Sequence, residues 1–232
     1  MEPSLISADT FIHALSAKHR VVLLGGMAII SHGLSRKTKD VDIWLDPMNT
    51  TAAWAAALKE CLDVFSGVYL WSLADRCVLA HEDVAGEIEE NGVLRVSEFD
   101  RDIDVFRRPN ELGIESFEEV WQRSVKVLEG GVRLPDPLDL YISKANTGRE
   151  HDWQDQLFLE SLVKARFKER LPVCDLAEAT TMLDRFLDPE CLQYARTNPH
   201  PEVRALALKY LREFEAEGDP YSRDILAAGG WE

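Results

Sequence analysis

The chain has 232 residues and a formal net charge of −15 at pH 7, and 46% of its residues are hydrophobic. This length is enough to bury a core in one large domain, or in one domain with a smaller appendage, and the composition excludes a disordered or fibrous protein. No apolar run approaches the roughly 18 residues that would cross a bilayer. The amino terminus lacks the basic start and long apolar segment of a secretory signal. We therefore expect a cytoplasmic protein without a membrane partner.

The strong negative charge disfavours a general nucleic-acid-binding protein, because such proteins cluster lysine and arginine to neutralise phosphates. It still allows a nucleotide as substrate, provided that a local basic pocket or a divalent metal compensates the phosphate charge. The four cysteines lie far apart and include no CxxC pair, which predicts buried apolar side chains and no thiolate metal site. They are Cys61, Cys77, Cys174 and Cys191.

The first part of the chain alternates segments of helical and strand periodicity. We predict a helix over residues 8–18, a buried strand over 21–24 that ends at a Gly-Gly turn, a short helix over 27–34, a strand over 40–45 and a helix over 50–65. Residues 72–90 then favour a helix with charged faces. After the Asn-Gly turn at 91–92, the segments 93–98 and 102–106 are rich in Val and Ile and predict two short strands or one bent strand.

Beyond Pro109 the pattern becomes mostly helical. We predict a helix over 115–128, a strand-and-turn connection over 130–137, helices over 137–148 and 151–170, and two or three short helices divided by prolines up to residue 232. This order predicts an α+β fold, with a mixed β-sheet flanked by helices. We expect an α/β core over residues 1–135 and an all-helical C-terminal region, residues 136–232, packed on that core.

Two pairs of aspartates mark the predicted strands. Asp40 and Asp42 are two residues apart, as are Asp102 and Asp104, so each pair points to one face of its strand. Two desolvated carboxylates side by side cost on the order of several kcal/mol unless a cation or a proton compensates them. Hard oxygen ligands favour Mg²⁺ or Mn²⁺, which take the rest of their ligands from phosphates and water. A third carboxylate from a neighbouring strand would allow a second ion.

The glycine pair Gly25-Gly26, which follows the first buried strand, fits the same chemistry. A Gly-Gly turn at the start of a helix lets backbone amides approach a phosphate closely. The next loop adds hydroxyl and cationic groups that can hydrogen-bond the same anion: Ser35, Arg36, Thr38 and Lys39. The alternative is a solvent-exposed edge strand whose two aspartates pair with Lys39 and Arg36.

The run LLGGMAIISHGLSRKTKDVDIWL resembles the signature of the polymerase-beta-like nucleotidyltransferase superfamily, in which a hydrophobic run and a Gly-Gly or Gly-Ser pair precede an Asp-hydrophobe-Asp motif. The later IDVF is similar to the family's third-carboxylate strand. The block LPDPLDLYISKANTGREHDWQDQLFLESL resembles one in the stand-alone bacterial branch, which includes AbiEii-type toxins and uncharacterised nucleotidyltransferase-like proteins. The likeness covers residues 20–160 approximately and implies a nucleotidyltransferase-type sheet.

The resemblance also implies roles for the matching positions. Asp40, Asp42 and Asp104 would be the catalytic carboxylates and the ligands of Mg²⁺ or Mn²⁺, with Asp102 competing with Asp104. The nucleotide would be bound by Gly25, Gly26, Thr38, Lys144 and Asp152, together with Arg36 of the loop; Asp155 is the alternative to Asp152. Gly26 stands where the family often has Ser, so it would contact phosphate through its backbone alone.

We therefore expect a metal-dependent nucleotidyltransferase that moves a nucleoside monophosphate from an NTP to a hydroxyl acceptor, a tRNA or a protein, and releases pyrophosphate. The resemblance further implies a toxin-antitoxin component, with an antitoxin protein as a partner. The first alternative is a catalytically silent protein of the same fold that acts as a nucleotide-binding or interaction module. The second is a helical interaction protein whose C-terminal region carries the function.

Overall fold

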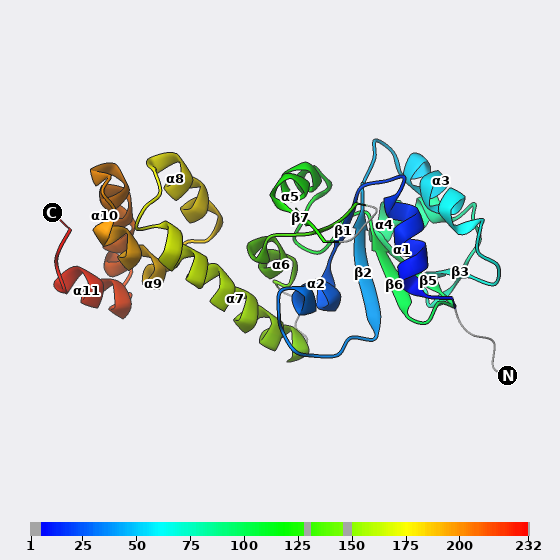
Figure 1. The fold of residues 1–232 in the computed structure, drawn as a ribbon, viewed down its shortest axis with the longest axis horizontal. Coiled ribbons are helices and arrows are strands. Elements are labelled where there is room, and N and C mark those ends of the chain that lie inside the picture. Colours follow the sequence, from blue (N-terminus) through cyan, green and yellow to red (C-terminus); the bar gives the residue numbers. More distant parts are fainter. Residues whose placement is uncertain (1–5, 128–130, 146–149, 232) are drawn as a thin grey trace. The chain divides into compact units, whose positions relative to one another are not determined.

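The structure is a computed structural model that describes residues 6–127, 131–145 and 150–231. The chain divides into two compact units, residues 1–159 and 160–232, and each is described by itself. This division falls later than the boundary expected after residue 135. The first unit contains the β-sheet and its flanking helices, and the second is helical (Figure 1).

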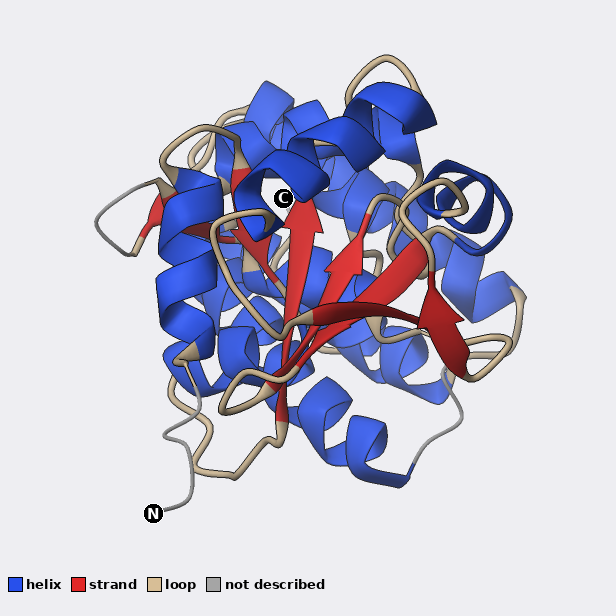
Figure 2. Ribbon diagram, turned by 90° about the vertical axis from the view of Figure 1, so that its right-hand side faces the viewer, coloured by secondary structure: helices blue, strands red, loops and turns tan. Residues whose placement is uncertain are grey.

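The first unit is built on a mixed sheet, for which the described residues supply eight strands in the order β4-β3-β5-β6-β2-β1-β8-β7. Strand β2 runs parallel to β6 and β1 runs parallel to β8, while the other neighbours are antiparallel. Figure 2 shows these strands with the ordinary twist of a sheet. The strands are β1 (Val21–Leu23), β2 (Asp40–Leu45), β3 (Tyr69–Ser72), β4 (Cys77–Leu79), β5 (Val93–Ser97), β6 (Asp102–Phe106), β7 (Val125–Lys126) and β8 (Val132–Leu134).

Helices connect these strands. They are α1 (Ala8–Ser16), α2 (Gly25–Ser31), α3 (Thr51–Leu62), α4 (Val84–Asn91), the 3₁₀ helix η1 (Ile114–Ser116), α5 (Phe117–Arg123) and α6 (Pro137–Ser143). Helix α7 (Glu150–Arg170) begins in the first unit and ends in the second. Polar caps set several of these starts: Thr50 accepts a hydrogen bond from the Ala53 amide, and Asp136 accepts one from the Leu138 amide.

The second unit continues with α8 (Leu176–Arg185), α9 (Pro189–Leu192), the 3₁₀ helix η2 (Gln193–Thr197), α10 (Pro201–Ala216) and α11 (Pro220–Ala227). Its described residues form no strand, so the predicted combination of a mixed sheet with an all-helical C-terminal part is confirmed. Proline at the first turn starts α9, α10 and α11, because that position needs no amide donor. None of the helices that the structure describes is long and apolar enough to cross a membrane.

The alternation in β2 and β6 gives the sheet two different faces. Val41, Ile43, Ile103 and Val105 are all buried on one face, where they form part of the apolar core. The aspartates of the same strands lie on the opposite face because successive side chains of a strand alternate. The apolar face therefore holds these strands in place, and the other face carries the aspartates at the start of each strand and Trp44 and Phe106 toward its end.

One predicted helix is wrong. The first part of residues 72–90 contains the last residue of β3, a turn and β4, and only the last part forms the helix α4. Strands β3 and β4 form a hairpin, in which Leu70 is paired to Leu79 and Ser72 to Cys77. The charged pattern is a genuine helical signal over α4, but its first residues pair with a neighbouring strand, and that pairing overrides local propensity. The Ser72 hydroxyl donates a hydrogen bond of 2.7 Å to Glu87, which ties the hairpin to α4.

Several boundaries also differ from expectation. The helices predicted to end at residues 18, 65 and 148 end at Ser16, Leu62 and Ser143, and residues 146–148 of the last one lie outside the described residues. Helix α2 starts at Gly25, so the two glycines form its first turn and do not precede it. The helix predicted over 115–128 ends at Arg123, and Val125–Lys126 form β7 against β8; the end of that predicted helix, residue 128, lies outside the described residues.

Candidate active site

Four carboxylates lie together on the polar face of β2 and β6, and this group is called the carboxylate face below. The parallel register pairs Asp40 with Asp102 and Asp42 with Asp104. Strand β2 has β6 on one side and β1 on the other, so the alternative of an exposed edge strand is wrong. Strand pairing thus brings together two sequence motifs that lie about sixty residues apart in the chain.

Arg95 of β5 lies among these carboxylates. Its Nε and Nη2 donate hydrogen bonds to the two carboxylate oxygens of Asp104, at 2.7 and 2.9 Å. Its Nη1 donates to Asp102 at 3.2 Å, and its Nη2 lies 3.9 Å from an oxygen of Asp40. One guanidinium therefore serves three of the four carboxylates of this face.

The environment of Asp104 shifts its proton affinity. Burial raises the pKa of the Asp104 carboxyl above its ordinary value, and the charges of Asp40 and Asp102 act in the same direction, while the hydrogen bonds from Arg95 oppose them. The same hydrogen bonds raise the pKa of Arg95, despite its partial burial. Asp104 is thus a buried carboxyl with an enhanced tendency to take a proton, fixed by a permanent cation.

Other side chains approach the glycine pair closely: Asp42 at Gly25, and Arg36 and Thr38 at Gly26. A Cβ at Gly25 would lie 1.7 Å from the Asp42 Oδ2, and the φ of Gly25 is +53°, a region that other residues rarely adopt. A Cβ at Gly26 would lie 2.7 Å from the Arg36 Nη2 and 2.8 Å from the Thr38 Oγ1. A side chain at Gly25 is therefore excluded by both the contact and the φ, whereas one at Gly26 would require Arg36 and Thr38 to shift.

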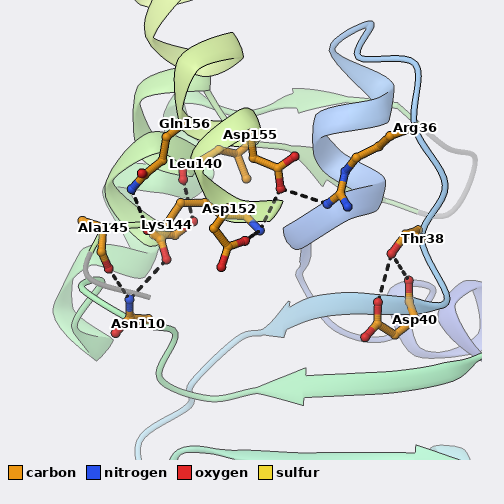
Figure 3. A network of polar contacts seen from close by, with 11 residues as sticks. Arg36, Thr38, Asp40, Asn110, Leu140, Lys144, Ala145, Asp152, Asp155 and Gln156 are labelled. Carbon is orange, nitrogen blue, oxygen red and sulfur yellow. Dashed lines mark hydrogen bonds and ion pairs between the residues drawn. The ribbon is translucent and has the colours of Figure 1, made fainter. Parts of the chain in front are cut away.

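Thr38 and Arg36 have separate partners. The Thr38 hydroxyl donates to the Asp40 Oδ1 at 2.9 Å, so it orients a carboxylate of the carboxylate face. Arg36 donates from Nη2 to the Asp155 Oδ2 at 2.9 Å, and the structure does not pair it with Asp40 or Asp42. Figure 3 shows both contacts, with the Thr38–Asp40 pair at the start of β2.

A second group of charges, the buried ion cluster, consists of Arg36, Lys144, Asp152 and Asp155 (Figure 3). The Lys144 Nζ lies 2.6 Å from the Asp152 Oδ1 and 3.1 Å from the Asp155 Oδ2. The side chains of Asp155, Asp152 and Lys144 are only 1%, 8% and 13% exposed. Two cations face two carboxylates, which is the pairing that buried charges need.

A cavity of about 170 Å³ lies between the two groups of charges. Its lining includes Gly25 and Asp42 from one side and Lys144 and Asp152 from the other. Asn110, which also lines it, donates a hydrogen bond of 2.7 Å to the Ala145 carbonyl and so connects the loop after β6 to the segment after α6. The cavity therefore joins the glycine pair, a carboxylate of β2 and a lysine, as a site for an anion held with a cation would require.

The donor set fits a hard divalent ion in part. Asp40 and Asp42 offer two carboxylates, and Mg²⁺ is usually bound by one or two carboxylates and by substrate phosphates. Asp104 is engaged by Arg95, and no group of three or more His, Cys, Asp or Glu side chains suited to a metal ion exists among the residues described. Asp40 and Asp42 as ligands of a divalent ion, and Asp104 as a third ligand, therefore stay predictions.

The structure brings most of the predicted positions into one region, since the carboxylate face and the buried ion cluster flank the same cavity. Two participants were not singled out by the sequence. Arg95 looked like an ordinary strand residue, although a hairpin register between β5 and β6 would have placed it opposite Asp104. Asn110 follows Pro109 in a loop and gave no signal.

Comparisons with known proteins add a single finding. The sequence matches no protein-family model and no curated protein. Among solved structures, one described as "putative nucleotidyltransferase from H. pylori" is similar at 17% sequence identity, with a TM-score of 0.35, over 91% of this chain and 96% of that chain.

Proposed function

We propose that the protein is a metal-dependent nucleotidyltransferase, which transfers a nucleoside monophosphate from an NTP to a hydroxyl acceptor and releases pyrophosphate. The observation that carries the proposal is the arrangement around the 170 Å³ cavity: Asp42 packs against Gly25 where no Cβ fits, and Lys144 faces them from α6. The resemblance of the sequence motifs to polymerase-beta-like nucleotidyltransferases supports the same activity.

The residues divide the work in a definite way. Asp40 and Asp42 would hold a divalent ion, which when bound neutralises charge on the triphosphate. Thr38 orients Asp40 through its hydroxyl, and Lys144 offers its ammonium group to the phosphates from the cavity wall. Catalysis in such a site comes mainly from positioning and from charge stabilisation.

Asp104 suits the acceptor side of the reaction. In the transfer, the acceptor oxygen forms a bond to the α-phosphorus, the bond from that phosphorus to the pyrophosphate oxygen breaks, and the acceptor hydroxyl loses its proton. Asp104 has a raised pKa, so its carboxylate accepts a proton more readily than an ordinary aspartate does. Arg95 fixes both of its oxygens and so positions it.

The test is the binding of each of the four NTPs with Mg²⁺, measured by calorimetry on the wild type, Asp42→Asn and the control Asp63→Asn. Asp63 is exposed and pairs only with Lys59 on α3. We expect one NTP to bind the wild type and the control equally, and at least about tenfold more weakly to Asp42→Asn, because a charged ligand of the metal is lost. Equal affinity in all three proteins would overturn the proposal.

A catalytically silent protein of the same fold is the second candidate, and one observation favours it. Arg95 occupies both oxygens of Asp104, so this carboxylate is less available to an acceptor than one without such a partner. Pyrophosphate release measured with a panel of acceptors separates the two candidates, since a silent protein binds the NTP and releases none. The toxin role and the antitoxin partner rest on the motif resemblance alone.

A further inference from the structure

A second cavity adjoins the carboxylate face on the side away from Lys144. It is called the aromatic hollow and measures about 430 Å³. Tyr69 and Trp71 of β3 line it together with Arg95, Glu98 and Asp102. The rings of Tyr69 and Trp71 lie 6.4 Å apart at an angle of 53°, and the Tyr69 hydroxyl donates a hydrogen bond of 3.3 Å to Glu98.

The sheet register places this hollow next to the candidate reaction centre. Trp71 pairs with Arg95, Arg95 with Asp104, and Asp104 with Asp42. These four residues form one row across β3, β5, β6 and β2. The 170 Å³ cavity touches the row at Asp42 and the aromatic hollow touches it at Trp71 and Arg95, and the two cavities share no lining residue. A transferase needs two sites in this relation, one for the donor and one for the acceptor, with the reacting groups between them.

The chemistry of the hollow selects for positive charge. Glu98 is exposed and the Asp102 side chain is 42% exposed, whereas the cation present, Arg95, is already bonded to Asp104. Aromatic faces attract ammonium and guanidinium groups, and they do so most strongly for tryptophan. The same surface repels a phosphate backbone, and the charge of −15 on the whole chain adds to that repulsion.

The spacing of the strands sets the distance between the basic residue and the hydroxyl residue of the acceptor. Neighbouring strands lie about 4.8 Å apart, so the backbone of Trp71 is on the order of 10 Å from that of Asp104, two strands away. An extended peptide advances about 3.3 Å per residue. A basic residue on Trp71 and a hydroxyl residue at Asp104 would therefore be about three positions apart along one extended segment.

We propose that the aromatic hollow binds the acceptor, and that the acceptor is a protein segment with a Ser, Thr or Tyr hydroxyl flanked by basic side chains. This inference rests on the nucleotidyltransferase proposed above. The acceptor hydroxyl oxygen attacks the α-phosphorus of the NTP, pyrophosphate leaves, the proton passes to the Asp104 carboxylate, and the product is a protein with a nucleoside monophosphate in phosphodiester linkage.

The experiment measures peptide binding without nucleotide, by fluorescence anisotropy of labelled peptides. The probes are Lys-Ala-Ala-Ser-Ala-Ala-Lys and the same peptide with glutamate in place of lysine, and an unmodified tRNA is the competitor. The variants are Trp71→Ala and Glu98→Lys, with Trp153→Ala and Glu82→Lys as matched controls. Trp153 and Glu82 are exposed and line neither cavity.

We expect the lysine peptide to bind the wild type and both controls, and to lose about tenfold in affinity with Trp71→Ala. Glu98→Lys, an exposed substitution with little effect on folding, should weaken the lysine peptide and improve binding of the glutamate peptide. Absence of lysine-peptide binding to the wild type, equal binding of both peptides, or displacement by tRNA that depends on Trp71 would overturn the inference.

Mg²⁺-dependent NTP binding is measured on the same variants. Trp71→Ala should leave it unchanged, because Trp71 lies outside the 170 Å³ cavity. Failure of the wild type to bind the lysine peptide while it still binds the NTP therefore rejects the acceptor site alone, whereas lack of NTP binding by the wild type rejects the proposed function.

Discussion

The carboxylate face and the buried ion cluster are both groups of charges in the first unit, but they differ in balance and in exposure. In the buried ion cluster two cations meet two carboxylates, and Asp155 is almost fully buried. In the carboxylate face one guanidinium contacts three of the four carboxylates, and Asp40 and Asp102 are 40% and 42% exposed. The buried ion cluster is enclosed and meets the 170 Å³ cavity through Lys144 and Asp152, whereas the carboxylate face is more open to a cation from outside. The two groups therefore differ in what stabilises them: ion pairs within the cluster, and a bound cation at the carboxylate face.

The largest effect on the free energy of unfolding is expected from a substitution in the buried ion cluster. Asp155→Asn leaves Arg36 and Lys144 with one carboxylate in a buried place, and removing one partner of such a group costs about 3–5 kcal/mol. Urea denaturation checks this loss in the free energy of unfolding, against Asp63→Asn, an exposed pair whose loss costs at most about 0.5 kcal/mol. A loss below about 1 kcal/mol for Asp155→Asn would show that the cluster is not structural.

A steric change should follow in size. Gly25→Ala forces a Cβ toward the Asp42 carboxylate at a positive φ, and we expect a loss of about 3 kcal/mol. Gly86 offers the matched control, because it lies within α4 and an added Cβ there meets nothing within 4 Å. Gly86→Ala should gain about 0.5–1 kcal/mol. Similar thermal stability of Gly25→Ala and wild type would show that a Cβ fits beside Asp42.

The sharing of Arg95 among three carboxylates predicts a response to metal. Arg95→Gln removes the shared guanidinium and should cost about 2 kcal/mol in metal-free buffer. Saturating Mn²⁺ should recover more of the stability of this variant than it adds to the wild type, because the ion replaces the lost positive charge. Denaturation curves with and without Mn²⁺ measure both, with Arg76→Gln in the exposed turn after β3 as control. An identical response of all three proteins would contradict the account.

The smallest effect concerns thiol reactivity and leaves both charge groups intact. Cys77 is exposed, while Cys61, Cys174 and Cys191 are buried. Burial raises the pKa of all three buried thiols, and that of Cys191 to about 12. At pH 8 these thiols hold less thiolate than a free cysteine and react slowly. Mass spectrometry of brief alkylation should find one rapid site, absent in Cys77→Ser; a second rapid site would show that a buried thiol is accessible.

Local patterns in the sequence predict part of this site. The alternation of DVDIWL and DIDVF, with apolar residues at every second position, predicts both strands and the common face of their aspartates. The pairing of β2 with β6 follows only from the whole sheet. The contact of Arg36 with Asp155 joins residues 119 apart, and no local pattern specifies such a contact.

Local sequence patterns do not reveal the role of Arg95 or the β3–β4 hairpin. Arg95 becomes significant only through the register that sets it opposite Asp104, and the turn before β6 is irregular, with Glu98 at a φ of +77°. The hairpin was concealed by charged residues at helical spacing, although it supplies Trp71 and Tyr69 to the aromatic hollow. Both features depend on the pairing of strands within the sheet.

The central claim is that Asp40 and Asp42 of the carboxylate face hold the metal ion of a metal-bound triphosphate, while Lys144 of the buried ion cluster faces the phosphates. A crystal structure with Mn²⁺ and a non-hydrolysable NTP analogue, analysed by anomalous scattering, tests it directly. The account predicts manganese against the carboxylates of Asp40 and Asp42, with the triphosphate in the cavity between Gly25 and Lys144. Manganese bound at Asp152 and Asp155, or a nucleotide outside that cavity, would contradict it.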